Sequence, residues 1–160
     1  MVRATIALTV SIIILAVGTS RAQKWSEWEN DHAVAKHGLW LVIDAGADST
    51  CYMKQSYDDG SDHMDLIVTR QGAIHVVTPF YRGITSEINY WVDDGARRTV
   101  PFRTGLALGF ELDPAIMPEM KAGNLLYMTV RPRGQARQRQ IFILSGFTAA
   151  ARKLAAPPCR

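Results

Sequence analysis

The protein has 160 residues, of which 48% are hydrophobic, and a formal net charge of +3 from 18 basic and 15 acidic residues. Arg3 and Arg21 belong to an N-terminal segment that we expect to be removed, so the working chain keeps 18 − 2 = 16 basic residues and a net charge of +1. So small a charge argues against nucleic acid as a partner. The remaining 160 − 22 = 138 residues are enough for one domain with its own core.

Residues 1–22 have the layout of a secretory signal peptide. Arg3 precedes an apolar run from Ala4 to Val17, and Ser20 and Ala22 are small residues at the positions before a cleavage point. The alternative is an uncleaved membrane anchor, but a spanning helix needs about 20 apolar residues and this run is shorter. We therefore expect an exported protein, periplasmic or secreted, cleaved near Ala22, with no transmembrane segment in the mature chain.

The rest of the chain divides into a polar, Trp-containing segment at 23–37 and a single β-rich domain at 38–160. Apolar runs and alternating patterns predict strands within 38–44, 51–57, 63–70, 73–80, 87–103 and 125–145, several of them joined by Gly-containing turns. With about eight strands in all, the pattern predicts a mainly β protein folded as an antiparallel β-sandwich.

Two helices interrupt or follow these strands. The first is short and lies between strands, with Asp113 as N-cap, Pro114 at its first position and Gly123 at its end. The second is C-terminal, and we expect Ser145 to cap it. Its apolar face has the i, i+4, i+7 spacing of a packed helix, at Phe147, Ala151 and Leu154.

Only two cysteines are present, Cys51 and Cys159. In an oxidising compartment an even number of cysteines favours bridging, so we expect one intramolecular disulfide that ties the tail to the start of the domain. Two free thiols and an intermolecular link remain the alternatives. A redox-active pair is not indicated, because the chain has no Cys-x-x-Cys spacing.

Four stretches resemble the invasion-associated locus B family of small exported alphaproteobacterial proteins: Cys51–Gln55, Ile88–Arg103, Leu112–Val130 and Phe142–Leu154. The last is the most specific, a strand that ends in Leu-Ser-Gly-Phe and continues into a helix. The resemblance implies a periplasmic or surface-associated β-rich protein, linked in some relatives to host-cell invasion. Family members carry further cysteines before the short helix, where residues 103–112 have none, which indicates a divergent member or a sister group.

The sequence offers little for catalysis or metal binding. Asp58, Asp59, Asp62, His63 and Asp65 are close together, but they do not follow the calcium-loop pattern and are typical of a turn. The four histidines lack metal-ligand spacing, and Ser145 is not in a nucleophile elbow. We therefore expect no catalytic residue, metal or cofactor. The alternative is a periplasmic hydrolase whose site is assembled only in the fold.

Two features are candidate binding sites. The predicted hairpin at 131–140 carries four arginines suited to carboxylate or phosphate groups: Arg131, Arg133, Arg137 and Arg139. Trp25 and Trp28 precede the β-rich domain and could dock a partner. The alternatives are a hairpin tip kept soluble by its charge and tryptophans that fold back on the sandwich. The function predicted is a non-enzymatic binding protein, with an envelope protein or an anionic envelope component as partner.

Overall fold

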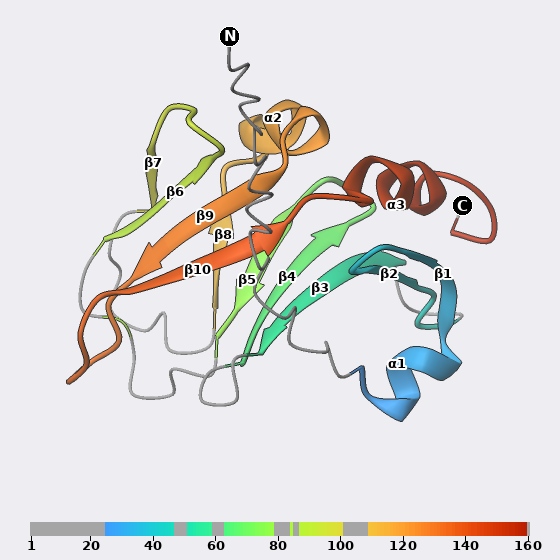
Figure 1. Cartoon of the computed structure of the whole chain (residues 1–160). Coiled ribbons are helices and arrows are strands. Elements are labelled where there is room, and N and C mark those ends of the chain that lie inside the picture. The colour runs from blue at the N-terminus through green and yellow to red at the C-terminus, as the bar shows by residue number, and fades with distance from the viewer. Residues whose placement is uncertain are drawn as a thin grey trace, which may run out of the picture.

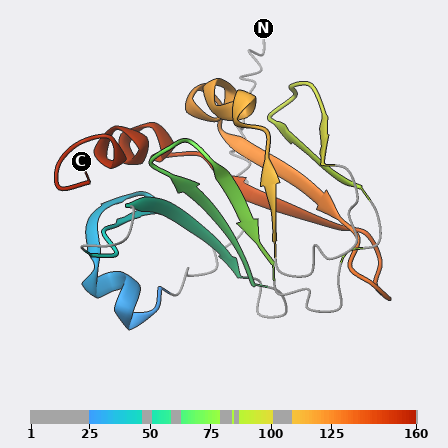
Figure 2. The same ribbon diagram turned by 180° about the vertical axis from the view of Figure 1, so that it is seen from behind.

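The computed structural model describes residues 25–46, 51–58, 63–78, 84, 87–100 and 109–159. The predicted signal peptide at 1–22 lies outside these described residues. Within them, ten strands form two antiparallel sheets that face each other, with α2 above one end of the pair (Figures 1 and 2). This confirms the prediction of a mainly β protein with two layers of antiparallel strands.

The larger sheet has six strands in the order β1-β2-β3-β4-β5-β8. Their bounds are Ala33–His37 for β1, Trp40–Ile43 for β2, Tyr52–Asp58 for β3, His63–Thr69 for β4, Ile74–Val77 for β5 and Gly109–Leu112 for β8. Neighbours along the chain pair through β5, and β8 then returns from a later part of the sequence to pair with β5. β1 falls within the polar N-terminal segment of the sequence.

The smaller sheet has four strands in the order β10-β9-β6-β7. Their bounds are Ile88–Val92 for β6, Arg98–Val100 for β7, Leu125–Val130 for β9 and Gln138–Ile143 for β10. The hairpin that joins β9 to β10 projects at the end opposite α2 (Figure 1), and Gly134 has a φ of 77° at its tip. β10 is an edge strand, so one of its sides is not paired within this sheet.

The inner faces of the two sheets form one hydrophobic core. Alternate residues of each strand point into it, as period-2 geometry requires. The fully or almost fully buried side chains come from both layers and include Met53, Met64, Leu66, Tyr90, Leu126, Met128 and Phe142. Because the core uses one face of each sheet, the other face of each is left for solvent, helices or partners.

The described part of the chain contains four helical segments, all of them short. They are α1 at Glu27–Asp31, the 3-10 turn η1 at Pro114–Ile116, α2 at Met117–Ala122 and α3 at Phe147–Leu154. Asp113 caps η1 as predicted, since its side chain accepts a hydrogen bond from the backbone N–H of Ala115. None of the described helices is long and apolar enough to cross a bilayer.

The predicted cap of the C-terminal helix is wrong. Gly146, not Ser145, occupies the N-cap position of α3, with a φ of 88° and no side-chain cap hydrogen bond. The backbone here runs against the turn between β1 and β2, and a Cβ on Gly146 would lie 2.2 Å from the carbonyl oxygen of His37. A side chain at this position is excluded by contact, so the tight approach decides where the helix begins.

Candidate interaction surface

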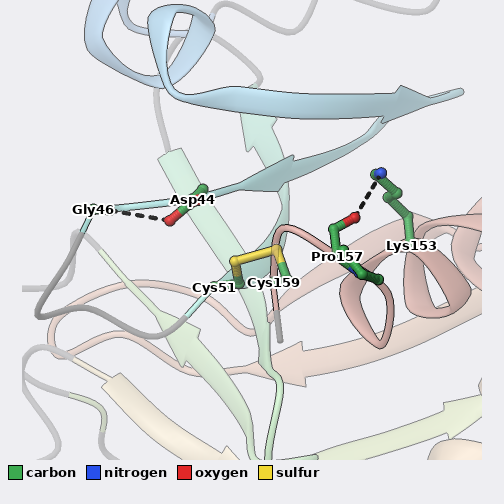
Figure 3. The surroundings of a disulfide bond; sticks show 6 residues. All are labelled: Asp44, Gly46, Cys51, Lys153, Pro157 and Cys159. Atoms are coloured by element: carbon green, nitrogen blue, oxygen red, sulfur yellow. Dashed lines mark hydrogen bonds between the residues drawn. A yellow bond between two sulfur atoms is a disulfide. The ribbon is translucent and has the colours of Figure 1, made fainter.

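The disulfide between Cys51 and Cys159 is present, with a Cα–Cα distance of 5.4 Å, which confirms the predicted pairing (Figure 3). Cys51 directly precedes β3, and both cysteines are buried. The last turn before Cys159 is held by Lys153 Nζ, which donates to the carbonyl oxygen of Pro157 at 3.0 Å. A bridge over a separation of 108 residues stabilises the fold by at most about 4 to 5 kcal/mol in the chain-entropy account.

The tail that the disulfide fastens packs on the six-stranded sheet. α3 contacts β1, β2 and β3, and its buried side chains are Phe147, Ala150 and Leu154. The Phe147 ring meets Trp40 edge to face, with 4.9 Å between ring centroids. Helix, disulfide and sheet therefore form one packed end of the molecule, and both cysteines serve a structural role there.

The outer face of the six-stranded sheet carries a buried ion network under α1. Lys54 of β3 pairs with Glu29 of α1 and, at 2.9 Å, with Asp65 of β4. The three side chains are only 11 to 13% exposed. Ser56 donates to Asp65 at 2.6 Å, and Ser26 forms a capping box with Glu29. Lys54 thereby ties the short acidic helix α1 to the sheet.

The ionisation of this network follows from its contacts. Burial alone would raise the pKa of Glu29, but hydrogen bonds from Lys54 and Ser26 outweigh it and lower the pKa below its ordinary value of 4.5. Burial alone would lower the pKa of Lys54, and the two carboxylates outweigh it and raise that pKa. Lys54 and Glu29 are therefore held in their charged forms.

The two tryptophans proposed from the sequence lie at this N-terminal end. Trp28 of α1 is 47% exposed, and its ring stacks on His32 with 4.3 Å between centroids. Trp25 is half-buried. In both views α1 lies on the opposite side of the molecule from the β9–β10 hairpin (Figures 1 and 2). The structure therefore separates the two binding features that the sequence suggested.

The arginines proposed from the sequence divide between a tip and a strand. Arg131, Arg133 and Arg137 are exposed in the loop of the β9–β10 hairpin, whereas Arg139 lies on β10. Among the described residues, no carboxylate pairs with Arg133 or Arg137. At Arg133 and Arg137 the tip thus presents positive charge that no carboxylate of the described residues neutralises.

Arg139 belongs to a second group on the outer face of the four-stranded sheet. Trp91 of β6 and Tyr127 of β9 are directly paired across the strands and stack with 5.4 Å between ring centroids. Arg97 lies 4.6 Å from the centroid of the Trp91 ring, and Arg139 lies 5.9 Å from the centroids of both rings. Trp91 is left only 8% exposed although it faces away from the core.

Two exposed aliphatic side chains continue this group along the edge strand. Ile141 and Ile143 of β10 are 37% and 38% exposed, and Ile141 is paired across the strands with Tyr127. We call this group the aromatic–arginine face, defined by Trp91, Arg97, Tyr127, Arg139, Ile141 and Ile143. It combines cations, stacked rings and apolar area, the composition that dominates binding hot spots in protein interfaces.

The sequence did not single out Trp91, Tyr127 or Arg97. A usable signal was present, because the alternation that buries Tyr90 places Trp91 on the opposite face of the same strand. The pairing of Trp91 with Tyr127 depends on the register of β6 with β9. That register joins distant segments, so the cluster is visible only in the fold.

The remaining candidates stay separate. His75 of β5 pairs with Glu111 of β8 at 3.3 Å across the six-stranded sheet, while His32 and His37 lie near α1 and on β1. Asp65 of the acidic stretch is bound to Lys54, and residues 59–62 lie outside the described part of the chain. Within the described part, no three His, Cys, Asp or Glu side chains come together as a metal-binding group.

Fold and surface together define a disulfide-bonded protein of two antiparallel β-sheets with a C-terminal helix. No family model matches the chain, and no curated protein matches it significantly. A solved structure is similar: invasion-associated protein B from Bartonella henselae, with a TM-score of 0.54 and 22% sequence identity over 75% of this chain and 94% of that one. At this identity the likeness shows a shared fold.

Proposed function

We propose that this chain is an exported, non-enzymatic binding protein of the periplasm or cell envelope, distantly related to the invasion-associated locus B proteins. Its partner is an anionic component of the envelope, bound by the arginines of the β9–β10 hairpin. The observation that carries this proposal is the projecting, exposed position of Arg133 and Arg137, which no described carboxylate neutralises.

Export is supported by three independent features. Residues 1–22 have the pattern of a signal peptide, a disulfide joins Cys51 to Cys159, and the similar fold is that of an invasion-associated protein. Structural disulfides are typical of oxidising compartments. Recovery of a mature chain that begins at Gln23 from the periplasm of a secreting bacterial host would support export and cleavage, whereas a full-length chain that stays in the cytoplasm would contradict both.

Binding to the envelope is supported by the chemistry of the hairpin tip. Guanidinium groups bind phosphate and carboxylate groups through paired hydrogen bonds. Near an anionic bilayer each basic residue contributes about 1 kcal/mol of attraction. Arg133 and Arg137 on one projecting loop therefore suffice for weak binding that depends on salt concentration.

The test uses vesicles of zwitterionic lipid with and without an anionic phospholipid, together with the mature, oxidised protein. We expect binding to the anionic vesicles only, and at least about tenfold weaker binding when Arg131, Arg133 and Arg137 are changed to Ser. The matched control changes three exposed basic residues elsewhere to Ser: Arg70, Lys121 and Arg152. Equal losses in both variants would show that only net charge matters and would overturn the assignment to the hairpin.

A further inference from the structure

The cations of the aromatic–arginine face differ from a neighbouring arginine in their partners. Arg98 forms two hydrogen bonds with Glu119, at 3.0 and 2.5 Å. Arg97, one residue earlier, and Arg139 lie over aromatic rings instead, and within the described residues neither pairs with a carboxylate. The hydrogen-bonding groups of these two guanidiniums thus have no anionic partner in the described part of the chain.

The outer face of this sheet lacks negative charge on three of its four strands. Its outward positions on β6, β9 and β10 hold no acidic residue: they are Asn89, Trp91, Leu125, Tyr127, Thr129, Arg139, Ile141 and Ile143. The charge of the face is therefore positive, and it lies beside the apolar surface of the edge strand. A complementary ligand must carry both negative charge and apolar groups.

The arrangement argues against a sugar stacked on the rings. A carbohydrate needs an open aromatic face, but Trp91 is only 8% exposed, with Arg97 over its ring. Stacked guanidiniums are pre-organised, so less side-chain entropy is lost when each one binds a carboxylate. The face therefore suits carboxylates above the rings and aliphatic or aromatic side chains beside them.

The other sheet of the same molecule also carries a cation on its outer face, and there a helix of this chain supplies the carboxylate that pairs with it. On the six-stranded sheet, the acidic helix α1 brings Glu29 onto Lys54, and both side chains are largely buried there. α1 also carries Glu27 and has no basic residue in its last turn. No described segment does the same for Arg97 and Arg139.

We propose that the aromatic–arginine face docks an acidic, amphipathic segment of a partner protein. Carboxylates of the partner bind Arg97 and Arg139, and its apolar side chains pack on Ile141, Ile143 and the edge of Tyr127. This surface is separate from the hairpin tip and its partner is a protein rather than a lipid, so the inference goes beyond the proposed function and does not depend on it.

The test titrates the mature, oxidised protein with a synthetic acidic amphipathic helix of Glu and Leu, followed by the backbone amide NMR signals of β6, β9 and β10. We expect saturable shifts at these strands. Affinity should fall about tenfold or more in the double variant Arg97→Gln/Arg139→Gln. A control peptide with Gln in place of every Glu should bind the wild-type protein at least about tenfold more weakly than the Glu peptide does.

Two further measurements distinguish this face from the hairpin tip. The variant Arg133→Ser/Arg137→Ser removes the same charge from the hairpin tip and should bind the peptide nearly as well as wild type. The double variant Arg97→Gln/Arg139→Gln should still bind anionic vesicles. The proposal is overturned if the peptide does not bind, if the Gln peptide binds equally, or if the hairpin variant alone loses the peptide. It is also overturned if anionic vesicles, and not the peptide, bind at this face.

Discussion

The outer faces of the two sheets differ in how their cations are buried and paired. On the six-stranded sheet, Lys54 is enclosed by Glu29 and Asp65 beneath a helix of the same chain. On the four-stranded sheet, Arg97 and Arg139 lie exposed over stacked aromatic rings. The first face is covered and neutralised internally. Among the described residues no segment covers the second face, and its charge is left for solvent or a partner.

This difference indicates which of the two faces contributes more to the stability of the fold. A buried ammonium group loses its hydration and is tolerated only when anions and hydrogen bonds replace the water. An exposed guanidinium keeps part of its hydration and needs no such replacement, so stacking on a ring is sufficient. The covered face should therefore determine stability, and the uncovered face should determine binding.

The largest effect should come from removing the buried cation. In Lys54→Met, Glu29 and Asp65 are left facing each other with no positive charge between them, and α1 loses its attachment. We expect the free energy of unfolding to fall by about 2 to 4 kcal/mol, below the full cost of an uncompensated buried pair because these side chains are partly exposed. Denaturant unfolding of the oxidised protein measures it.

Lys36→Met is the matched control, since Lys36 is an exposed lysine on the neighbouring part of the same sheet. Its unfolding free energy should stay within about 0.5 kcal/mol of wild type. If the two lysine variants are equally stable, the ion network does not hold α1 and the contrast between the faces fails.

A smaller effect is expected from acid. The pKa of Glu29 is lower in the folded protein than its ordinary value of 4.5, so the charged form stabilises the fold above that pH. This contribution is lost as the pH falls through the folded pKa, where the carboxylate becomes protonated. The stability difference between wild type and Glu29→Gln should be constant from neutral pH to about pH 5 and shrink below pH 4.5.

Hydrogen exchange of the α1 amides can follow the same transition locally. Protection of α1 should decrease in acid before that of β9, because α1 depends on this ion network and β9 lies between two paired strands. A constant difference between wild type and Glu29→Gln down to pH 3 would contradict the lowered pKa.

Much of the fold was predictable because its signals are local. Alternation and turn residues identified β3, β4, β6, β9 and β10, and the helix pattern identified α3. β1 and β8 were not predicted, since these strands are short, lie at the edges of the sheet and have weak patterns. The cap of α3 was misassigned to Ser145 because the approach of His37 to Gly146 is a tertiary contact.

The sites also differ in whether the sequence alone could predict them. Cys51 and Cys159 were paired correctly because two cysteines allow only one internal bridge. The arginine hairpin is contiguous in sequence and therefore visible in it. The ion network of Lys54 and the stack of Trp91 on Tyr127 each join separate segments through sheet register or helix docking, and neither follows from composition or spacing alone.

The smallest effect on stability should come from the uncovered face. In Arg97→Gln/Arg139→Gln, two exposed cations leave the rings of Trp91 and Tyr127, and an exposed cation–π contact is worth about 0.5 to 1 kcal/mol at most. Gln retains part of the aliphatic cover, so we expect the free energy of unfolding to change by about 1 kcal/mol or less, measured by the same denaturant titration as for Lys54→Met. A loss as large as that of Lys54→Met would mean that the arginines are structural, and weaker peptide binding by this variant would then reflect a damaged sheet. If the variant keeps the free energy of unfolding of wild type but binds the peptide more weakly, the two arginines contribute to binding a partner and not to the stability of the fold.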